Sequence, residues 1–155
     1  MKREKKEDTR LFLIVGLFIL ACIVVGWNVI VNLTNINTKT YHGQEAVMIL
    51  KNQMMNNPYD YAALGFTDNT KTDILLIRIN QATRTKYEFT TKMIDPNTAS
   101  PVVFVATSVL KVTTNIDVNR EAANCDRIKQ EQQKSMSDDE IVLATTTIAL
   151  LTGSM

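Results

Sequence analysis

The feature that most constrains this chain is an apolar run at residues 11–31, LFLIVGLFILACIVVGWNVIV. An α-helix rises about 1.5 Å per residue, so about 20 residues cross a hydrocarbon core about 30 Å thick. The run therefore predicts a membrane-spanning helix, with an interfacial tryptophan near its far end. The residues that we expect to form this anchor include Leu11, Phe12, Gly16, Phe18, Cys22, Gly26, Trp27, Asn28 and Val31.

The charges on the two sides of this run indicate an orientation. Residues 1–10 carry five basic side chains, whereas the segment after the run has no charge before Lys39. The positive-inside rule counts lysine and arginine and largely ignores acidic residues. We therefore expect residues 1–10 to be a cytoplasmic tail and the rest of the chain to lie outside the cytoplasm, in the periplasm if the chain is bacterial. The residues that set this topology are Lys2, Arg3, Lys5, Lys6 and Arg10.

Cys22 leaves two alternatives to a permanent anchor. The tetrapeptide ILAC that ends at Cys22 resembles a bacterial lipobox, in which a small residue precedes the acylated cysteine. However, Leu20 occupies a slot that is usually small, and the apolar tripeptide IVV follows where a polar tether is usual. A cleaved secretory signal would have a shorter apolar core and a small-x-small cleavage site. The length of the run favours an uncleaved helix, with Cys22 facing lipid or a partner helix.

The rest of the chain begins with a polar segment, residues 32–40, which predicts a tether to a small domain over residues 41–155. Apolar residues at helical spacing predict a helix over 41–56, and Pro58 predicts its end. Residues 59–72 show neither the spacing of a helix nor the alternation of a strand, which predicts a loop or a short helical turn.

Three strands are predicted in the middle of the domain. Residues 74–80 and 85–94 alternate between apolar and polar side chains, with a reversal at 81–84 and a turn at 95–97. Residues 101–116 are rich in β-branched side chains and apolar on both faces, which predicts a long, covered central strand. Short connections between these strands predict an antiparallel three-stranded meander.

Two helices are predicted at the C-terminal end. Residues 120–134 form a mostly charged and amide-rich helix, for which Asp117 or Asn119 would be the N-cap. Ser137 and Glu140 form a capping-box pattern before a helix over 138–152. The predicted fold class is thus α+β: one transmembrane helix, then a small domain whose sheet is covered on one face by helices 41–56 and 138–152.

The sequence carries no catalytic signature. It has one histidine, His42, and no spacing typical of a metal site, and its five glycines form no phosphate-binding loop. The acidic residues 138–140 are explained more simply as a helix cap than as an acid–base pair. The net charge of +1 offers no electrostatic basis for nucleic-acid binding. We therefore expect a protein that is not an enzyme, with no cofactor, no metal and no evident small-molecule substrate.

The expected partners are membrane lipid and other protein subunits, with a homo-oligomer left open. Partner contacts are expected on helix 120–134, and an unpaired cysteine there could also form an intermolecular disulfide. The layout is similar to small membrane-anchored subunits of bacterial secretion, conjugation or pilus-assembly machines, which implies a non-enzymatic structural or assembly subunit of an envelope-spanning complex. It is also similar to membrane-anchored virion proteins that link an internal membrane to a capsid. The candidate contact residues are Cys125, Arg127, Gln130 and Gln133.

Overall fold

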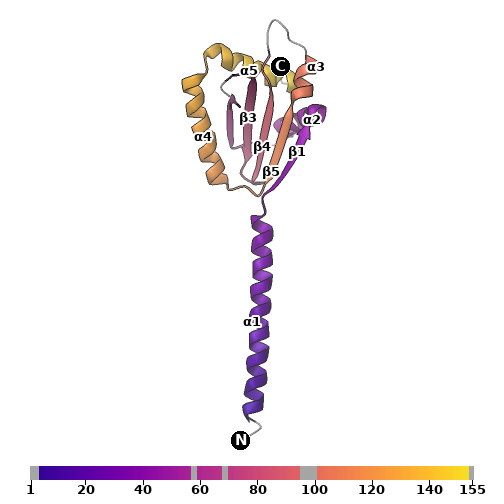
Figure 1. The fold of residues 1–155 in the computed structure, drawn as a ribbon, viewed down its shortest axis with the longest axis vertical. Coiled ribbons are helices and arrows are strands. Elements are labelled where there is room, and N and C mark those ends of the chain that lie inside the picture. Colours follow the sequence, from indigo (N-terminus) through magenta and orange to yellow (C-terminus); the bar gives the residue numbers. More distant parts are fainter. Residues whose placement is uncertain (1–3, 57–58, 68–69, 95–100, 154–155) are drawn as a thin grey trace. The chain divides into compact units, whose positions relative to one another are not determined.

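The computed structural model describes residues 4–56, 59–67, 70–94 and 101–153. The chain divides into two compact units, Met1–Asn35 and Ile36–Met155. The first unit contains helix α1, Glu4–Thr34, and the second is a mixed α+β domain (Figure 1).

The second unit is built on a five-stranded antiparallel sheet in the order β1-β5-β4-β3-β2 (Figure 1). Strands β2 to β5 are each paired with their neighbour in the chain, whereas β1 joins the far edge beside β5. The sheet therefore has five strands and is not a strict meander. The strands are β1 Asn37–His42, β2 Tyr61–Phe66, β3 Asp73–Asn80, β4 Thr85–Lys92 and β5 Val109–Thr114.

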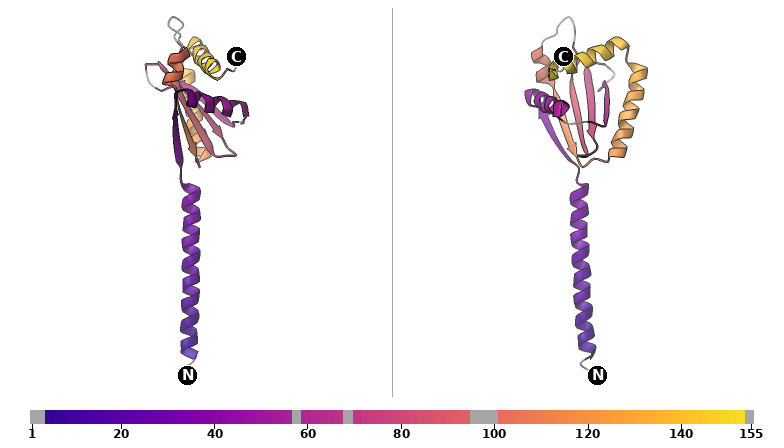
Figure 2. Two further views of the ribbon diagram at one scale, coloured as in Figure 1. Left: turned by 90° about the vertical axis from the view of Figure 1, so that its right-hand side faces the viewer. Right: turned by 180° about the vertical axis from the view of Figure 1, so that it is seen from behind.

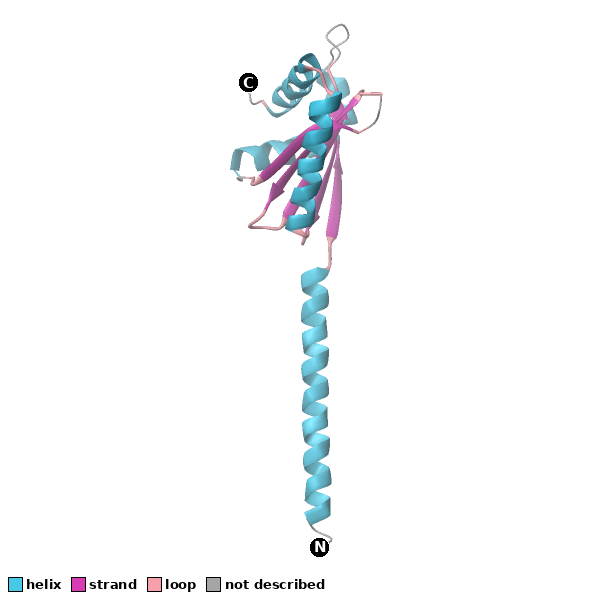
Figure 3. Cartoon of the chain, turned by 90° about the vertical axis from the view of Figure 1, so that its left-hand side faces the viewer, coloured by secondary structure: helices cyan, strands magenta, loops and turns pink. Residues whose placement is uncertain are grey.

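Helices cover both faces of this sheet (Figure 2). Helices α2, Gly43–Asn56, and α5, Asp138–Thr152, pack on one face around Leu50, Phe89 and Ile148. Helix α4, Val118–Ser135, packs on the other face and runs along the strands (Figure 3). The short helix α3, Pro101–Thr107, leads into β5.

The alternation along β3 explains why two cores form. Ile74 and Leu76 point to the α2/α5 face, whereas Ile77 and Ile79 point to the α4 face. Successive side chains of a strand project to opposite faces, so a strand that is apolar on both sides needs cover on both sides. The predicted strands at 74–80 and 85–94 and the reversal at 81–84 are confirmed, while the turn expected at 95–97 lies outside the described residues.

The predicted strand over 101–116 was wrong in its first half, which forms α3. Proline suits the first position of a helix, because it has the right φ and its missing N–H would be unpaired there. Ser108 then ends α3: its hydroxyl donates a hydrogen bond of 2.6 Å to the carbonyl of Phe104. Only residues Val109–Thr114 continue as a strand, and this strand does lie inside the sheet.

Two further strands were missed, because both lie at edges of the sheet. Residues 32–40 were expected to be a tether, but β1 occupies Asn37–His42 with mostly exposed polar side chains and therefore shows no apolar alternation. Residues 59–72 were expected to be a loop, but they contain β2, a short run of small and apolar residues that is covered on both sides.

The predicted C-terminal helices are confirmed together with their caps. Asp117 caps α4 by accepting a hydrogen bond from the Arg120 amide. Ser137 and Glu140 form the reciprocal capping box of α5, and Gly153 ends that helix in the left-handed conformation at φ 68°. The helix predicted over 41–56 is confirmed as α2.

Candidate functional site

Helix α1 contains a segment, Glu7–Ile30, that is long and apolar enough to cross a membrane. None of this segment is buried against the rest of the described chain. The anchor residues from Leu11 to Asn28 are part of it, whereas the side chain of Val31 lies outside the described residues. The amide of Asn28 donates a hydrogen bond of 3.0 Å to the carbonyl of Val24, so part of its polarity is satisfied within the helix.

The basic residues expected to set the topology are mostly beyond what the structure describes. Residues 1–3 are not described, and neither are the side chains of Lys5 and Lys6. Arg10 lies in α1 with an exposed side chain.

Helix α4 presents two different faces. Its inner face places Cys125 and Ile128 against β2 and β3. A close approach is possible because β2 has a glycine there: a Cβ atom on Gly65 would lie 3.2 Å from Cγ2 of Ile128. The outer face carries Arg127, Gln130 and Gln133, all exposed.

Cys125, expected among the contact residues, is fully buried under α4. Burial raises the pKa of its thiol, which keeps it protonated and weakly nucleophilic. His42 is exposed on β1, at the sheet edge opposite β2, so the structure does not bring these two groups together. In this conformation the Cys125 thiol is not accessible to a partner protein.

Ion pairs connect both ends of α4 to the domain. At its start, Lys86 of β4 lies 3.0 Å from Glu121 and 3.4 Å from Glu88. The pKa of Lys86 is raised: its burial, the largest effect, opposes the charged form, but the two carboxylates together outweigh it. These carboxylates therefore hold a partly buried cation in place.

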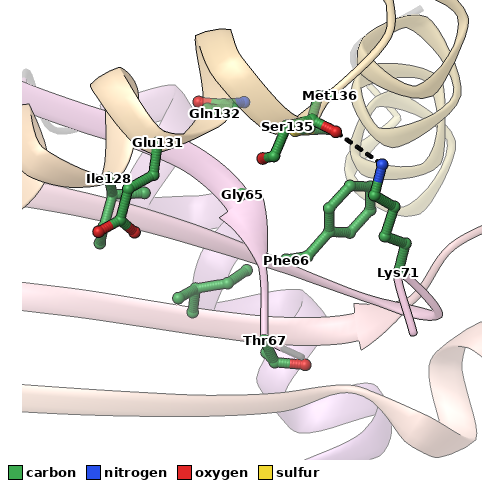
Figure 4. Close-up of a pocket in the computed structure, with 10 residues that line it drawn as sticks. Gly65, Phe66, Thr67, Lys71, Ile128, Glu131, Gln132, Ser135 and Met136 are labelled. Atoms are coloured by element: carbon green, nitrogen blue, oxygen red, sulfur yellow. Dashed lines mark hydrogen bonds between the residues drawn. The ribbon is translucent and has the colours of Figure 1, made fainter. Parts of the chain in front are cut away.

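A cavity of about 270 Å³ lies at the other end of α4, between this helix and β2 (Figure 4). Its one lysine, Lys71, donates a 2.6 Å hydrogen bond to the carbonyl of Ser135 and pairs with Glu140 at 3.1 Å. The pKa of Glu140 is lowered by the hydrogen bond from the Ser137 amide and by the Lys71 side chain. Because Glu140 already neutralises this cation, the pair has a structural role: it connects the β2–β3 connection to the α4–α5 corner.

The α2/α5 face of the sheet has a second cavity, which contains a buried cation. A cavity of about 520 Å³ lies there, with Arg78 in its lining. Arg78 is only 5% exposed, and its Nε and Nη1 atoms have no hydrogen-bond partner among the residues that the structure describes. Its guanidinium carbon lies 3.9 Å from the centre of the Tyr59 ring. Burial lowers the pKa of Arg78, but a guanidinium remains protonated at neutral pH.

A second buried polar side chain on this face also lacks partners. Gln53 of α2 is 3% exposed, and within the described part of the chain neither its amide nitrogen nor its amide oxygen forms a hydrogen bond. Gln53 lines a smaller cavity of about 250 Å³ together with Tyr87, which is the Cα partner of Arg78 in the sheet. Buried polar groups are nearly always satisfied, so these two side chains on one face of the sheet are exceptions that need an explanation.

Comparisons with protein-family models, with curated proteins and with solved structures find no significant match. Within the described part of the chain, no group of three histidine, cysteine, aspartate or glutamate residues is placed to hold a metal ion.

Proposed function

We propose that this chain is a single-pass membrane protein that serves as a non-enzymatic structural or assembly subunit of an envelope-spanning complex. The observation that carries the proposal is the segment Glu7–Ile30 of α1, which is long and apolar enough to cross a membrane. Twenty-four residues of helix span about 36 Å, which is enough for a hydrocarbon core. In water, so large an exposed apolar surface would cause association.

The basic N-terminal tail supports a cytoplasmic N-terminus, with the α+β domain on the other side of the membrane. The outer face of α4 supports contact with a partner subunit. Its side chains are charged or carry amides, which suits a polar and reversible contact rather than an obligate apolar interface. Arg127 is held by hydrogen bonds to Glu131 and Asn124 and is thus oriented before any partner arrives.

Orientation can be tested by cysteine labelling in intact cells. Cys125 is buried and Cys22 lies in the apolar segment, so both should react slowly with a membrane-impermeant maleimide. A Gln133→Cys variant should be labelled in intact cells, whereas Lys5→Cys should be labelled only after lysis. The reverse pattern would overturn the proposed orientation, and labelling of both before lysis would overturn the span.

The subunit role can be tested by site-specific photo-crosslinking in the native host. A photoreactive residue at Gln130 or Gln133 should give a discrete crosslinked product, whereas one at Gln81, exposed in the β3–β4 turn, should not. Native mass measurement after mild extraction provides a second measurement. A clean monomer that also gives no crosslink from α4 would overturn the subunit role.

A further inference from the structure

We infer that the cavity around Arg78 is a binding site for a small amphipathic carboxylate, that is, one carboxylate on a linear apolar tail. This inference is independent of the subunit role proposed above. It rests on the construction of the cavity, on the missing partners of the guanidinium and on the single charge in the lining.

The floor of the cavity consists of two cross-strand pairs of the sheet. Arg78 is the Cα partner of Ala62, and Leu76 is the Cα partner of Leu64. All four lie on the α2/α5 face, because they alternate with the residues that pack under α4. The small side chain of Ala62 leaves room directly beside the guanidinium.

The walls are mostly apolar. Helix α2 contributes Met54, and α5 contributes Ile148 and Ala149. Ala149 is small, which widens the space in the same way as the alanine of the floor. A volume of about 520 Å³ is within the range of pockets for small molecules, roughly 300–1,000 Å³.

The distribution of charge in the cavity lining indicates which class of ligand would bind. Of the nine described residues that line the cavity, Arg78 alone is charged. A guanidinium donates charge-assisted hydrogen bonds to a carboxylate, and the Nε and Nη1 atoms of Arg78 have no partner among the described residues. Phosphate and diphosphate groups are more often held by several cations or by a helix N-terminus, neither of which this lining supplies. One carboxylate at the guanidinium and an apolar tail along Leu64, Leu76 and Ile148 would satisfy both parts of the cavity.

Tyr59 completes the site from the segment before β2. Its ring stacks on the guanidinium at 3.9 Å and is about half exposed, so it covers one face of Arg78. A stacked arginine loses less side-chain freedom when it binds, because its plane is already fixed.

The test uses the full chain with ¹³C-labelled tyrosine in detergent micelles, with sodium octanoate as the probe and 1-octanol as the uncharged control. The ring resonance of Tyr59, assigned with a Tyr59→Phe variant, reports on the cavity and not on partition of the probe into micelles. Octanoate should shift this resonance saturably. It should bind about tenfold or more tightly than octanol, because a charge-assisted hydrogen bond contributes at least that factor.

Three variants separate binding through the guanidinium, binding through the apolar walls and nonspecific binding to an exposed arginine. Arg78→Met should abolish the preference for octanoate over octanol. Ala149→Phe fills the cavity but keeps the guanidinium, and it should weaken both probes. Arg120→Met removes an exposed arginine of α4 as the matched control and should bind octanoate like the wild type.

The inference is overturned if octanoate and octanol bind the wild type equally, or if Arg78→Met retains the preference. It is equally overturned if acetate or inorganic phosphate competes as well as octanoate, since the apolar walls would then play no part. Binding of an apolar peptide through its free carboxylate, with no binding of octanoate, would show that the occupant is a partner chain and not a small molecule.

Discussion

Replacing Arg78 should stabilise the domain, which is unusual for a buried residue. Arg78 is 5% exposed, and two of its nitrogens have no hydrogen-bond partner in the described ranges of the chain. An unsatisfied buried donor costs about 1–3 kcal/mol. Against this, the stack on the half-exposed Tyr59 contributes only about 0.5–1 kcal/mol. Two such donors cost about 2–6 kcal/mol, and methionine has a similar reach and adapts to irregular space. After the loss of the stack is subtracted, Arg78→Met should raise the free energy of unfolding by about 1–5 kcal/mol.

The assay is thermal unfolding of the full chain in detergent, followed by circular dichroism at a wavelength dominated by the sheet. For a domain of about 120 residues, 1 kcal/mol corresponds to a shift in Tm of about 4 °C, so the expected rise is about 4–20 °C. Lys86→Met is the matched control, because Lys86 is also a partly buried cation but is paired with Glu121 and Glu88. Its loss should lower stability by about 1.5–3 kcal/mol, the range for hydrogen bonds to charged groups.

Opposite signs for these two variants would support the reasoning. If Arg78→Met instead lowers Tm as Lys86→Met does, then Arg78 is a structural cation whose packing outweighs its missing partners. The missing partners of the guanidinium would then not indicate a ligand-binding site. Sites that bind ligands commonly cost stability in the free protein, so a stabilised Arg78→Met that no longer binds octanoate is the combined result we expect.

Four further predictions concern the rest of the domain. Ser137→Ala removes the N-cap of α5 and should lower the free energy of unfolding by about 1 kcal/mol, measured from urea midpoints; no change would mean that α5 is held by packing alone. The folded-state pKa of Glu140 is lowered, so the stability that its carboxylate contributes is fully present above its unfolded pKa and is lost as the pH falls through its folded pKa. A Glu140→Gln variant should therefore show a smaller fall in Tm with decreasing pH than the wild type. An equal fall in both proteins would contradict this. Gly65→Ala places a Cβ 3.2 Å from Ile128 and should cost about 1–3 kcal/mol by overpacking, which Ile128→Val should partly restore if the clash is the cause. Cys125 should react with a thiol reagent only in denaturant, and fast labelling of the native chain would show that α4 opens.

The sequence predicted the elements whose signals are local. Helix α5 has a capping box at Ser137 and Glu140 and a glycine at its end, and these groups interact within a few residues of each other. Strand β3 has a clear two-residue period. Such patterns come from residues that are close together in the sequence, so they do not depend on tertiary packing.

The elements that were missed depend on tertiary context. Strand β1 is polar and exists because β5 lies beside it, with Tyr41 opposite Leu110. Helix α3 has β-branched residues that favour a strand, but Pro101 begins a helix, and Phe104 is buried against the domain. Local propensity is a weak predictor where packing decides, as it does at both places.

The candidate cavity was also missed, although one signal for it was present. Arg78 interrupts an apolar strand, on the face opposite Leu75, Ile77 and Ile79, and in a strand covered on one side this second face is normally solvated. The alternation alone could not show that α2 and α5 cover that second face as well. A charged residue in a strand that is covered on both sides is a better indicator of a site than the cysteine and histidine that drew attention in the sequence.

Strand β2 links the two proposals and makes them separable. Its Ala63 and Gly65 pack under α4, whereas its Ala62 and Leu64 form the floor of the cavity on the opposite face. Variants that fill the cavity therefore leave the outer face of α4 unchanged, and variants on that outer face leave the cavity unchanged. If octanoate nevertheless alters crosslinking from Gln133, this edge strand is one route for the signal, beside β3 and the α4–α5 corner. Slower amide exchange of β2 in the presence of octanoate would then identify it as the coupling element, and unchanged exchange would exclude that route.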